Sequence, residues 1–173
     1  MRNLSPSLQG ILLMSVFSSS VVLAESDLDF HDELASPQNF SQGNIALITQ
    51  TGEFQEIAVQ QRGFQNQVES LQLGEQNVLE LQQMGSDQVL INHQEGRENI
   101  VNVSQNGQGN QLLSEQLGNY NRIDVAQDGA DIYTNVTQHG DHNLVELEQM
   151  GQGLRSQVIQ DGDNQVARVI QGY

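Results

Sequence analysis

The densest group of potential metal ligands in the sequence is the segment HGDH, which holds His139, Asp141 and His142. Imidazole and carboxylate groups are common zinc ligands, and three of them around an open fourth position would define a catalytic zinc site. The same residue types are also common at polar turns, and a glycine lies inside the segment. We interpret the segment as a polar turn and predict no metal site there.

Two aspartate-glycine segments raise the same question for calcium. Residues 128–131 (DGAD) and 161–163 (DGD) each place two carboxylates at an expected turn. Calcium-binding β-rolls repeat a tandem Gly-Gly-x-Gly-x-Asp pattern, which this sequence lacks. No group of serine, histidine and aspartate suggests a nucleophile with its base. We therefore predict no catalytic residue, no metal and no cofactor, and the chain is not expected to be an enzyme.

The composition argues against several classes of partner. The chain has 173 residues, no cysteine and no tryptophan, and a formal net charge of -16. Such an acidic chain cannot neutralise phosphates, so we expect no nucleic-acid partner and no attraction to an anionic membrane surface. Without cysteine, the chain does not depend on disulfides for its stability.

The first residues predict a chain of three regions. Arg2, the apolar run at 11–17 and the segment VVLA ending at Ala24 have the order of a secretory signal peptide, so we assign residues 1–24 to it. The apolar run is too short for a transmembrane anchor. Residues 25–43 are acidic and are interpreted as a leader, with a cap over the end of the folded part as the alternative. Residues 44–173 form a repeat region.

The repeat region has a period of eleven residues, carried by glutamine, glycine and a second amide three residues after each glycine. Glutamine occupies Gln50, Gln61, Gln72, Gln83, Gln94, Gln105, Gln116, Gln127, Gln138, Gln149, Gln160 and Gln171. Glycine occupies Gly52, Gly63, Gly74, Gly85, Gly96, Gly107, Gly118, Gly129, Gly140, Gly151 and Gly162. The second amide, at what we call the amide position, is Asn44, Gln55, Asn66, Asn77, Gln88, Asn99, Asn110, Asn121, Asn143 or Gln165, and the exceptions are Ile132 and Leu154.

The content of each unit favours strands over helices. Eleven residues also suit a right-handed coiled coil, at 3.67 residues per turn. From the amide to the glutamine, however, apolar residues alternate with polar ones, as in NIVNVSQ at 99–105. A glycine in every unit would cost a helix about 1 kcal/mol each, whereas at a turn it supplies positive φ. We predict seven-residue strands joined by four-residue turns.

The pattern of exceptions indicates how the strands stack. Ser70, Asn92 and Ser114 are polar residues in a normally apolar inward slot, and they lie 22 residues apart. This spacing favours a coil of two strands and two turns. We therefore predict an all-β fold, a β-solenoid of about six 22-residue strand-turn-strand coils that form two facing parallel sheets, about 29 Å tall at roughly 4.8 Å per coil.

In such a coil the amides point inward and can bond to identical amides one coil away. Each bond contributes only about 1 kcal/mol, whereas a buried amide left unpaired costs about 1 to 3 kcal/mol. The amide ladder is therefore expected to set the register of the stack. The last full unit, at 165–171, continues the pattern to the end, so its edge is expected to be a template for another copy.

The pattern Gln-x-Gly-x-x-Asn-x-φ-x-φ-x-Gln resembles the curlin repeat, the unit of curli, a bacterial extracellular functional amyloid. The segment QNGQGN at 105–110 matches the family turn Gln-x-Gly-x-Gly-Asn, and the resemblance covers residues 44–171. It implies a subunit secreted through the periplasm of a Gram-negative bacterium, via an outer-membrane curli secretion pore and accessory factors. It also implies a place in a cell-surface fimbrium used in biofilm and adhesion, with itself and other curlin subunits as partners.

Within that family the chain is more similar to the minor, nucleating subunit, which templates the major one. Its leader is acidic and poor in glycine, and most units begin with Asn or Gln where the major subunit often has Ser. The end of the chain is regular and has Arg155 and Arg168 as its only basic residues, which departs from the irregular basic ending of many minor subunits. A major curlin subunit is the alternative, and a non-amyloid β-solenoid adhesin is a more distant one.

Overall fold

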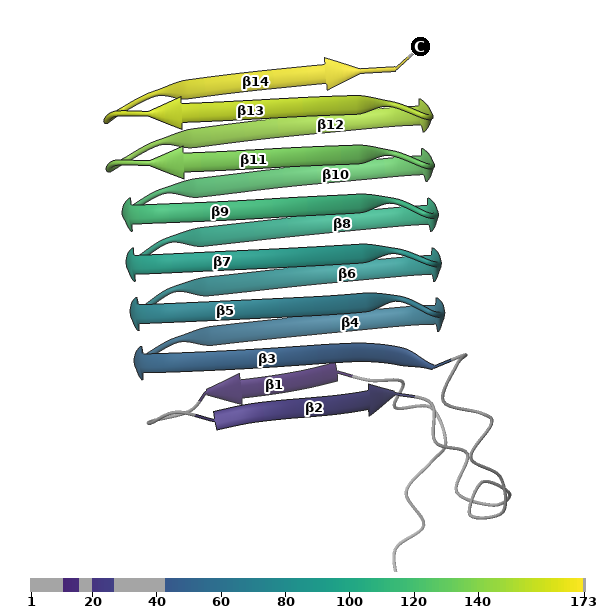
Figure 1. Ribbon diagram of the computed structural model, residues 1–173, viewed down its shortest axis with the longest axis horizontal. Coiled ribbons are helices and arrows are strands. Elements are labelled where there is room, and N and C mark those ends of the chain that lie inside the picture. Colours follow the sequence, from purple (N-terminus) through teal and green to yellow (C-terminus); the bar gives the residue numbers. More distant parts are fainter. Residues whose placement is uncertain (1–10, 16–19, 27–42, 173) are drawn as a thin grey trace, which may run out of the picture.

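The computed structural model describes residues 11–15, 20–26 and 43–172. The repeat region is a β-solenoid in which each coil contributes one strand to each of two facing sheets (Figure 1). Sheet A contains β4 (Glu56–Phe64), β6 (Val78–Ser86), β8 (Ile100–Gln108), β10 (Arg122–Ala130), β12 (Leu144–Gln152) and β14 (Val166–Gln171). Sheet B contains β3 (Asn44–Glu53), β5 (Gln67–Glu75), β7 (Val89–Arg97), β9 (Gln111–Asn119), β11 (Tyr133–His139) and β13 (Arg155–Asp161).

Strands of one sheet are parallel and in register at a spacing of 22 residues. Ile123 of β10, for example, pairs with Val101 on one side and with Val145 on the other. The predicted all-β solenoid of about six coils is confirmed. Ser70, Asn92 and Ser114 also lie side by side in sheet B, as their spacing predicted.

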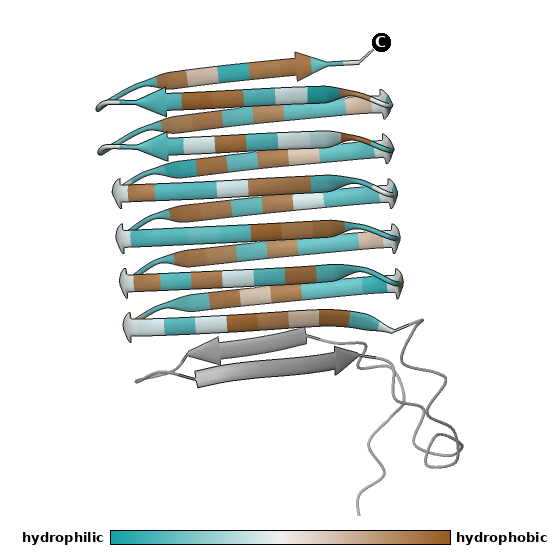
Figure 2. Ribbon diagram, in the orientation of Figure 1, coloured by the Kyte–Doolittle hydropathy of each residue, from teal (hydrophilic) through white to brown (hydrophobic). Residues whose placement is uncertain are grey.

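The core lies between the two sheets and is filled by the apolar residues that alternate along each strand (Figure 2). Val68, Leu90 and Leu112 from sheet B face Leu79 and Val101 from sheet A, and all five are fully buried. Because a strand turns successive side chains to opposite faces, these residues share the inward face with the glutamines. No helix in the described part of the chain is long and apolar enough to span a membrane.

Nine of the eleven turns between β3 and β14 have two residues rather than the four predicted, while the turns after β11 and β13 have four. In the shorter turns parallel pairing continues through the glycine, as from Gly52 to Glu53, so that only Phe54 and Gln55 separate β3 from β4. Phe54 takes the left-handed conformation, with φ of 56°. A Cβ on Gly107 would lie 1.9 Å from the carbonyl oxygen of Gly129 in the next coil. The glycines are therefore needed for close backbone approach between coils as well as for positive φ.

The first coil has neighbours of a different kind. The strands β1 (Ile11–Ser15) and β2 (Ser20–Ser26) pair antiparallel with β4 and β3. Most of these residues belong to the predicted signal peptide, and most of the predicted leader at 25–43 lies outside the described residues. At the other end, β13 and β14 each pair with one strand among the described residues.

Candidate functional site: amide ladders and strand edges

A continuous ladder of hydrogen bonds joins the glutamines within each sheet. In sheet B, Gln50 Nε2 donates to Gln72 Oε1 at 2.9 Å, and in sheet A Gln105 Nε2 donates to Gln127 Oε1 at 2.8 Å. All ten such bonds run from the earlier coil to the later one. The ladders therefore have a direction, with donors facing the C-terminal end of the stack.

The glutamines also tie the two sheets together. In most of these glutamines the second proton of Nε2 points to a backbone carbonyl of the opposite sheet, as from Gln116 of sheet B to Ile100 O of sheet A at 3.1 Å. Gln116 is fully buried, so its amide would be costly to leave unpaired. Most of these glutamines thus fix both the stacking of coils and the distance between sheets.

Asparagines at the amide position bond differently from the prediction. The Oδ1 atom of Asn77 accepts the backbone N–H of Asn99 in the next coil at 3.1 Å, and its Nδ2 donates to Gly96 O at 3.1 Å. A side-chain bond between two asparagines, as expected for the whole series, occurs between Asn66 and Asn44 at 3.0 Å. The asparagine side chain is short enough to reach the backbone of the next turn, so it holds the turns rather than forming an amide-to-amide ladder.

Glutamine at the amide position reproduces only half of this pattern. Gln88 Nε2 donates to Met84 O at 2.9 Å and to Gly107 O at 3.1 Å, as an asparagine would. The Oε1 atoms of Gln88 and Gln55 are buried and have no hydrogen-bond partner. The extra methylene moves the oxygen away from the N–H of the next coil, so these two positions leave an acceptor unsatisfied.

Two hydroxyl groups connect the glutamines of neighbouring coils from the opposite sheet. Thr134 Oγ1 accepts from Gln127 Nε2 at 3.0 Å and donates to Gln149 Oε1. Ser156 repeats this arrangement, accepting from Gln149 Nε2 at 3.1 Å and donating to Gln171 Oε1 at 2.7 Å. Both residues occupy an inward slot that is apolar in the other ten units. Their spacing of 22 residues was the signal that could have identified them.

The polar inward residues of sheet B form a second ladder of this kind. Asn92 Nδ2 donates to Ser70 Oγ at 3.1 Å, and Ser114 Oγ donates to Asn92 Oδ1 at 2.8 Å. All three side chains are buried. They satisfy each other only when the three coils are in register, which is the role expected of a register mark.

The potential metal ligands of the HGDH segment contact separate groups. His139 Nε2 lies 3.8 Å from Glu115 Oε2 on the outer face of sheet B. His142 stacks on Tyr120 with ring centroids 4.9 Å apart, and Asp141 Oδ1 accepts the N–H of Asn119 at 2.7 Å. In the described ranges, no three His, Cys, Asp or Glu side chains are arranged to hold a metal.

The aspartates of the two DG segments serve the turns. Asp128 Oδ1 accepts from Asn106 Nδ2 at 3.0 Å, and Asp163 Oδ1 accepts the backbone N–H of Asp141 at 2.8 Å. Both bonds connect residues 22 apart. These carboxylates therefore stabilise the stacking of neighbouring turns.

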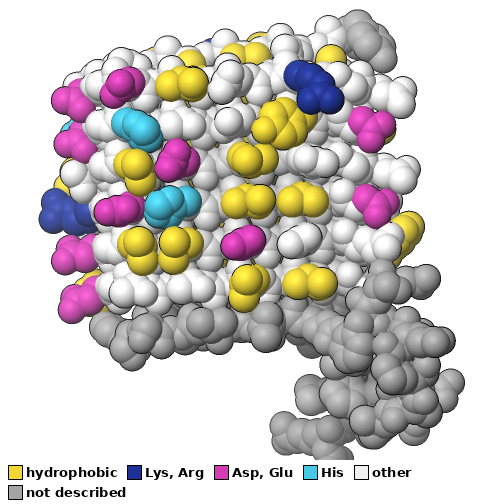
Figure 3. Space-filling view, viewed as in Figure 1, with side chains coloured by type: hydrophobic (Ala, Val, Ile, Leu, Met, Phe, Trp, Pro, Cys, Tyr) yellow, Lys and Arg dark blue, Asp and Glu magenta, His cyan; other side chains and the backbone are white. Residues whose placement is uncertain are grey.

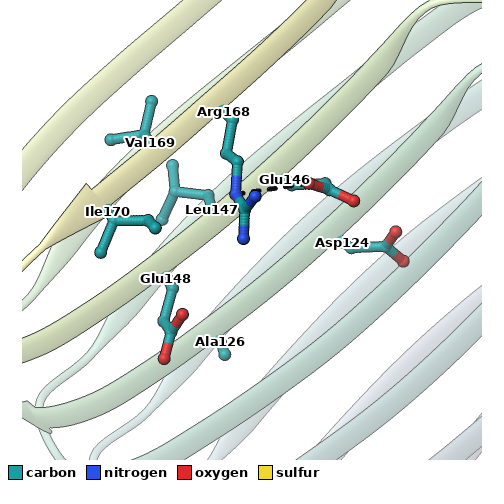
Figure 4. A pocket seen from close by; sticks show the side chains of 8 residues that line it. All are labelled: Asp124, Ala126, Glu146, Leu147, Glu148, Arg168, Val169 and Ile170. Atoms are coloured by element: carbon teal, nitrogen blue, oxygen red, sulfur yellow. Dashed lines mark ion pairs between the residues drawn. The ribbon is translucent and has the colours of Figure 1, made fainter.

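A shallow hollow on the outer face of sheet A gathers several acidic side chains near β14 (Figure 4). Glu146 and Glu148 lie around Ala126, and Arg168 Nε is 3.6 Å from Glu146 Oε2. Nearby, the hydrogen bond that Arg122 donates to Asp124 at 2.7 Å raises the pKa of the guanidinium above its ordinary value. The acids here are solvated and salt-bridged, and they form no pair suited to acid-base catalysis.

The two ends of the stack are complementary. At the C-terminal end, within the described residues, Gln160 Nε2 donates only to Leu144 O at 3.0 Å and Gln171 Nε2 only to Arg155 O at 3.4 Å. At the first coil, Oε1 of Gln50 and of Gln61 receives no hydrogen bond from any residue within 43–172. Within residues 43–172, one end therefore has amide donors, and the other amide acceptors, without a glutamine partner in a neighbouring coil.

These features define a two-sheet parallel β-solenoid whose buried polar contacts repeat once per coil. A scan against protein-family models, a search of curated proteins and a search of solved structures each found no match to this chain.

Proposed function

We propose that the chain is a structural subunit of extracellular curli-type amyloid fibres, and that it acts as the minor subunit that nucleates polymerisation of the major curlin. The observation that carries this proposal is the complementarity of the two ends of the stack. Donors on Gln160 and Gln171 face outward at one end, and acceptors on Gln50 and Gln61 do so at the other. A second copy placed end to end would continue both ladders in the same direction.

Stacking also continues the backbone pairing. The edges of β13 and β14 present unpaired ladder groups of the kind that recruit another strand. Val166 and Ile170 of β14 are 72% and 64% exposed because no later coil covers them. A further coil would pair these edges and reduce this exposure, and both changes favour growth at this end.

Processing of the N-terminus would free the opposite end. The antiparallel strands β1 and β2 occupy the edges of β4 and β3. Cleavage after Ala24 would remove all of β1 and all of β2 except Glu25 and Ser26. The exported chain would then offer its first coil to the last coil of another copy.

The proposal is tested by seeding. Fibres grown from residues 25–173 are sonicated and added at a few mole per cent to a fresh major curlin, and assembly is followed by thioflavin fluorescence. Loss of the lag phase supports the minor-subunit role. A requirement for stoichiometric amounts, with incorporation along the whole fibre, supports the major-subunit alternative. Reversible two-state melting with no fibres in native buffer would refute the amyloid proposal. The non-amyloid β-solenoid adhesin would then be the remaining alternative.

The control is the precursor with residues 1–24 retained. If β1 and β2 block the first coil, no precursor copy can accept the last coil of another, so the precursor should neither form fibres nor elongate seeds grown from residues 25–173. Equal rates for both forms would show that the antiparallel strands do not protect that edge.

A further inference from the structure

The outer faces of the two sheets differ at their centres. Each strand has four outward positions, and on sheet A the central two are small, polar or charged on every strand but the last. They are Ala58, Gln60, Glu80, Gln82, Asn102, Ser104, Asp124, Ala126, Glu146, Glu148, Arg168 and Ile170. On sheet B the same positions include Leu47, Leu71, Ile91, Leu113 and Ile159. Figure 3 shows this second face, with apolar side chains between scattered acids and two histidines.

Several of these apolar side chains are open to solvent. Ile91 is 42% exposed, Leu47 36% and Ile159 63%. A face six strands high and seven residues wide covers about 670 Å², so two such faces would bury about 1,300 Å², which is within the range of stable interfaces. The centre of such an interface is typically apolar and poor in charge, which fits sheet B and not sheet A.

We propose that this face, the outer face of sheet B, binds the same face of a second copy. The stacking axes of the two solenoids are then antiparallel, and their strands run in the same direction. The two-fold axis lies parallel to the strands, midway between β7 and β9. It places Ile91 against the partner subunit's Leu113, and His93 against the partner subunit's Glu115. This lateral pairing goes beyond the end-to-end stacking proposed above.

Charge complementarity selects this direction. With the axis between β7 and β9, no acidic side chain of the face opposes another. In the second copy, Asn135 lies opposite Glu69, Leu117 opposite Glu95, and Thr51 opposite Asp161. Glu115 already lies 3.9 Å from His93 Nδ1 and 3.8 Å from His139 Nε2. In the pair its carboxylate gains a further imidazole, so the most central acid of the face is the best neutralised.

The parallel alternative is less favourable. In that arrangement the two-fold axis runs along the stack, so each strand faces the same strand of the second copy. Each of the two central positions then opposes the other central position of that strand. Glu115 would then oppose the partner subunit's Leu113, and Glu69 the partner subunit's Leu71. Two carboxylates per copy would be desolvated against apolar side chains at the centre, which costs several kcal/mol.

A cross-linking experiment tests the face, the register and the direction together. The chain has no cysteine, so single cysteines are clean reporters. Ile91→Cys and Leu113→Cys chains are mixed in equal amounts and treated with a short bifunctional maleimide. We expect a mixed dimer as the main product. The matched control on sheet A mixes Asn102→Cys and Asp124→Cys chains, which occupy the equivalent positions of β8 and β10, and should stay monomeric on a denaturing gel.

A second measurement does not depend on cross-linking. Leu113→Glu places one unpaired carboxylate per copy at the centre of the pair and should weaken lateral association at least about thirtyfold. Ala126→Glu makes the same change on sheet A and should have no effect. Electron microscopy should show single filaments for the first variant and paired filaments for the second. Single filaments for every chain would overturn the pairing, and so would dimers cross-linked equally well through sheet A. End-to-end growth of the same chains is measured separately, from filament length.

Discussion

The contact between glycines of successive coils gives the sharpest test of the fold. A Cβ at Gly107 would lie 1.9 Å from Gly129 O, and the backbone there has φ of 113°. Contacts closer than 3.0 Å essentially never occur, so the two coils must separate by about 1.1 Å. The bond from Asn110 Nδ2 to Gly129 O, now 3.2 Å, would then exceed 4 Å and be lost.

The magnitude follows from these losses. We expect two or three hydrogen bonds at this turn to break at about 1 kcal/mol each, and the strained φ adds about 1 to 2 kcal/mol. Gly107→Ala should therefore destabilise the fold by about 3 to 5 kcal/mol. Gly153 is the matched control, since its φ is 66° and a Cβ there would meet nothing within 4 Å. Gly153→Ala should cost only about 1 kcal/mol, the cost of a left-handed alanine.

The assay is denaturant unfolding of monomeric chain, followed by far-ultraviolet circular dichroism at concentrations below assembly. The slope of free energy against denaturant should be similar for both variants, so that the midpoints report stability directly. A difference in unfolding free energy below about 1 kcal/mol between the two variants would refute the close-approach argument and leave positive φ as the only requirement for glycine.

Two further substitutions test the buried polar contacts. Gln88→Asn should stabilise the fold by about 1 kcal/mol, because it pairs a buried acceptor at the cost of burying one methylene less. The same change at the outward-facing Gln82 should leave the melting temperature unchanged. A loss of thermal stability for Gln88→Asn would contradict the proposed geometry. Thr134→Val should destabilise the fold by about 1 to 3 kcal/mol, because Gln127 and Gln149 each lose a hydrogen-bond partner. Thr137→Val, on the outer face of the same strand, should change the melting temperature little.

The fold was predictable because its determinants are periodic. The alternation of inward and outward residues defines a strand, and a shared spacing of 22 between Ser70, Asn92 and Ser114 defines the coil. Each determinant is a property of residue type and position, which the sequence contains directly. The exposed positions carry no such period, so the contrast between the two outer faces appeared only when the strands were sorted into sheets.

The contacts that were missed depend on reach rather than on pattern. Asparagine and glutamine look equivalent in a repeat, yet they differ by one methylene. Asn77 Oδ1 accepts the backbone N–H of Asn99 in the next coil, whereas Gln88 Oε1 has no hydrogen-bond partner. The two-residue turns could not be predicted for a similar reason: a glycine in the sequence indicates positive φ but does not show that strand pairing continues past it. The HGDH segment looked dense in the sequence, but a strand end followed by a turn directs its three side chains to different places.

The number of strands has a consequence for symmetry. The solenoid contains twelve parallel strands, so an end-to-end neighbour begins with a strand of sheet B directly after β14 of sheet A. Every subunit along a fibre then shows the same face on the same side. With an odd number of units each junction would still form all of its local bonds, but the faces would alternate from one subunit to the next. An even repeat count is thus what makes a continuous lateral surface available to a fibre.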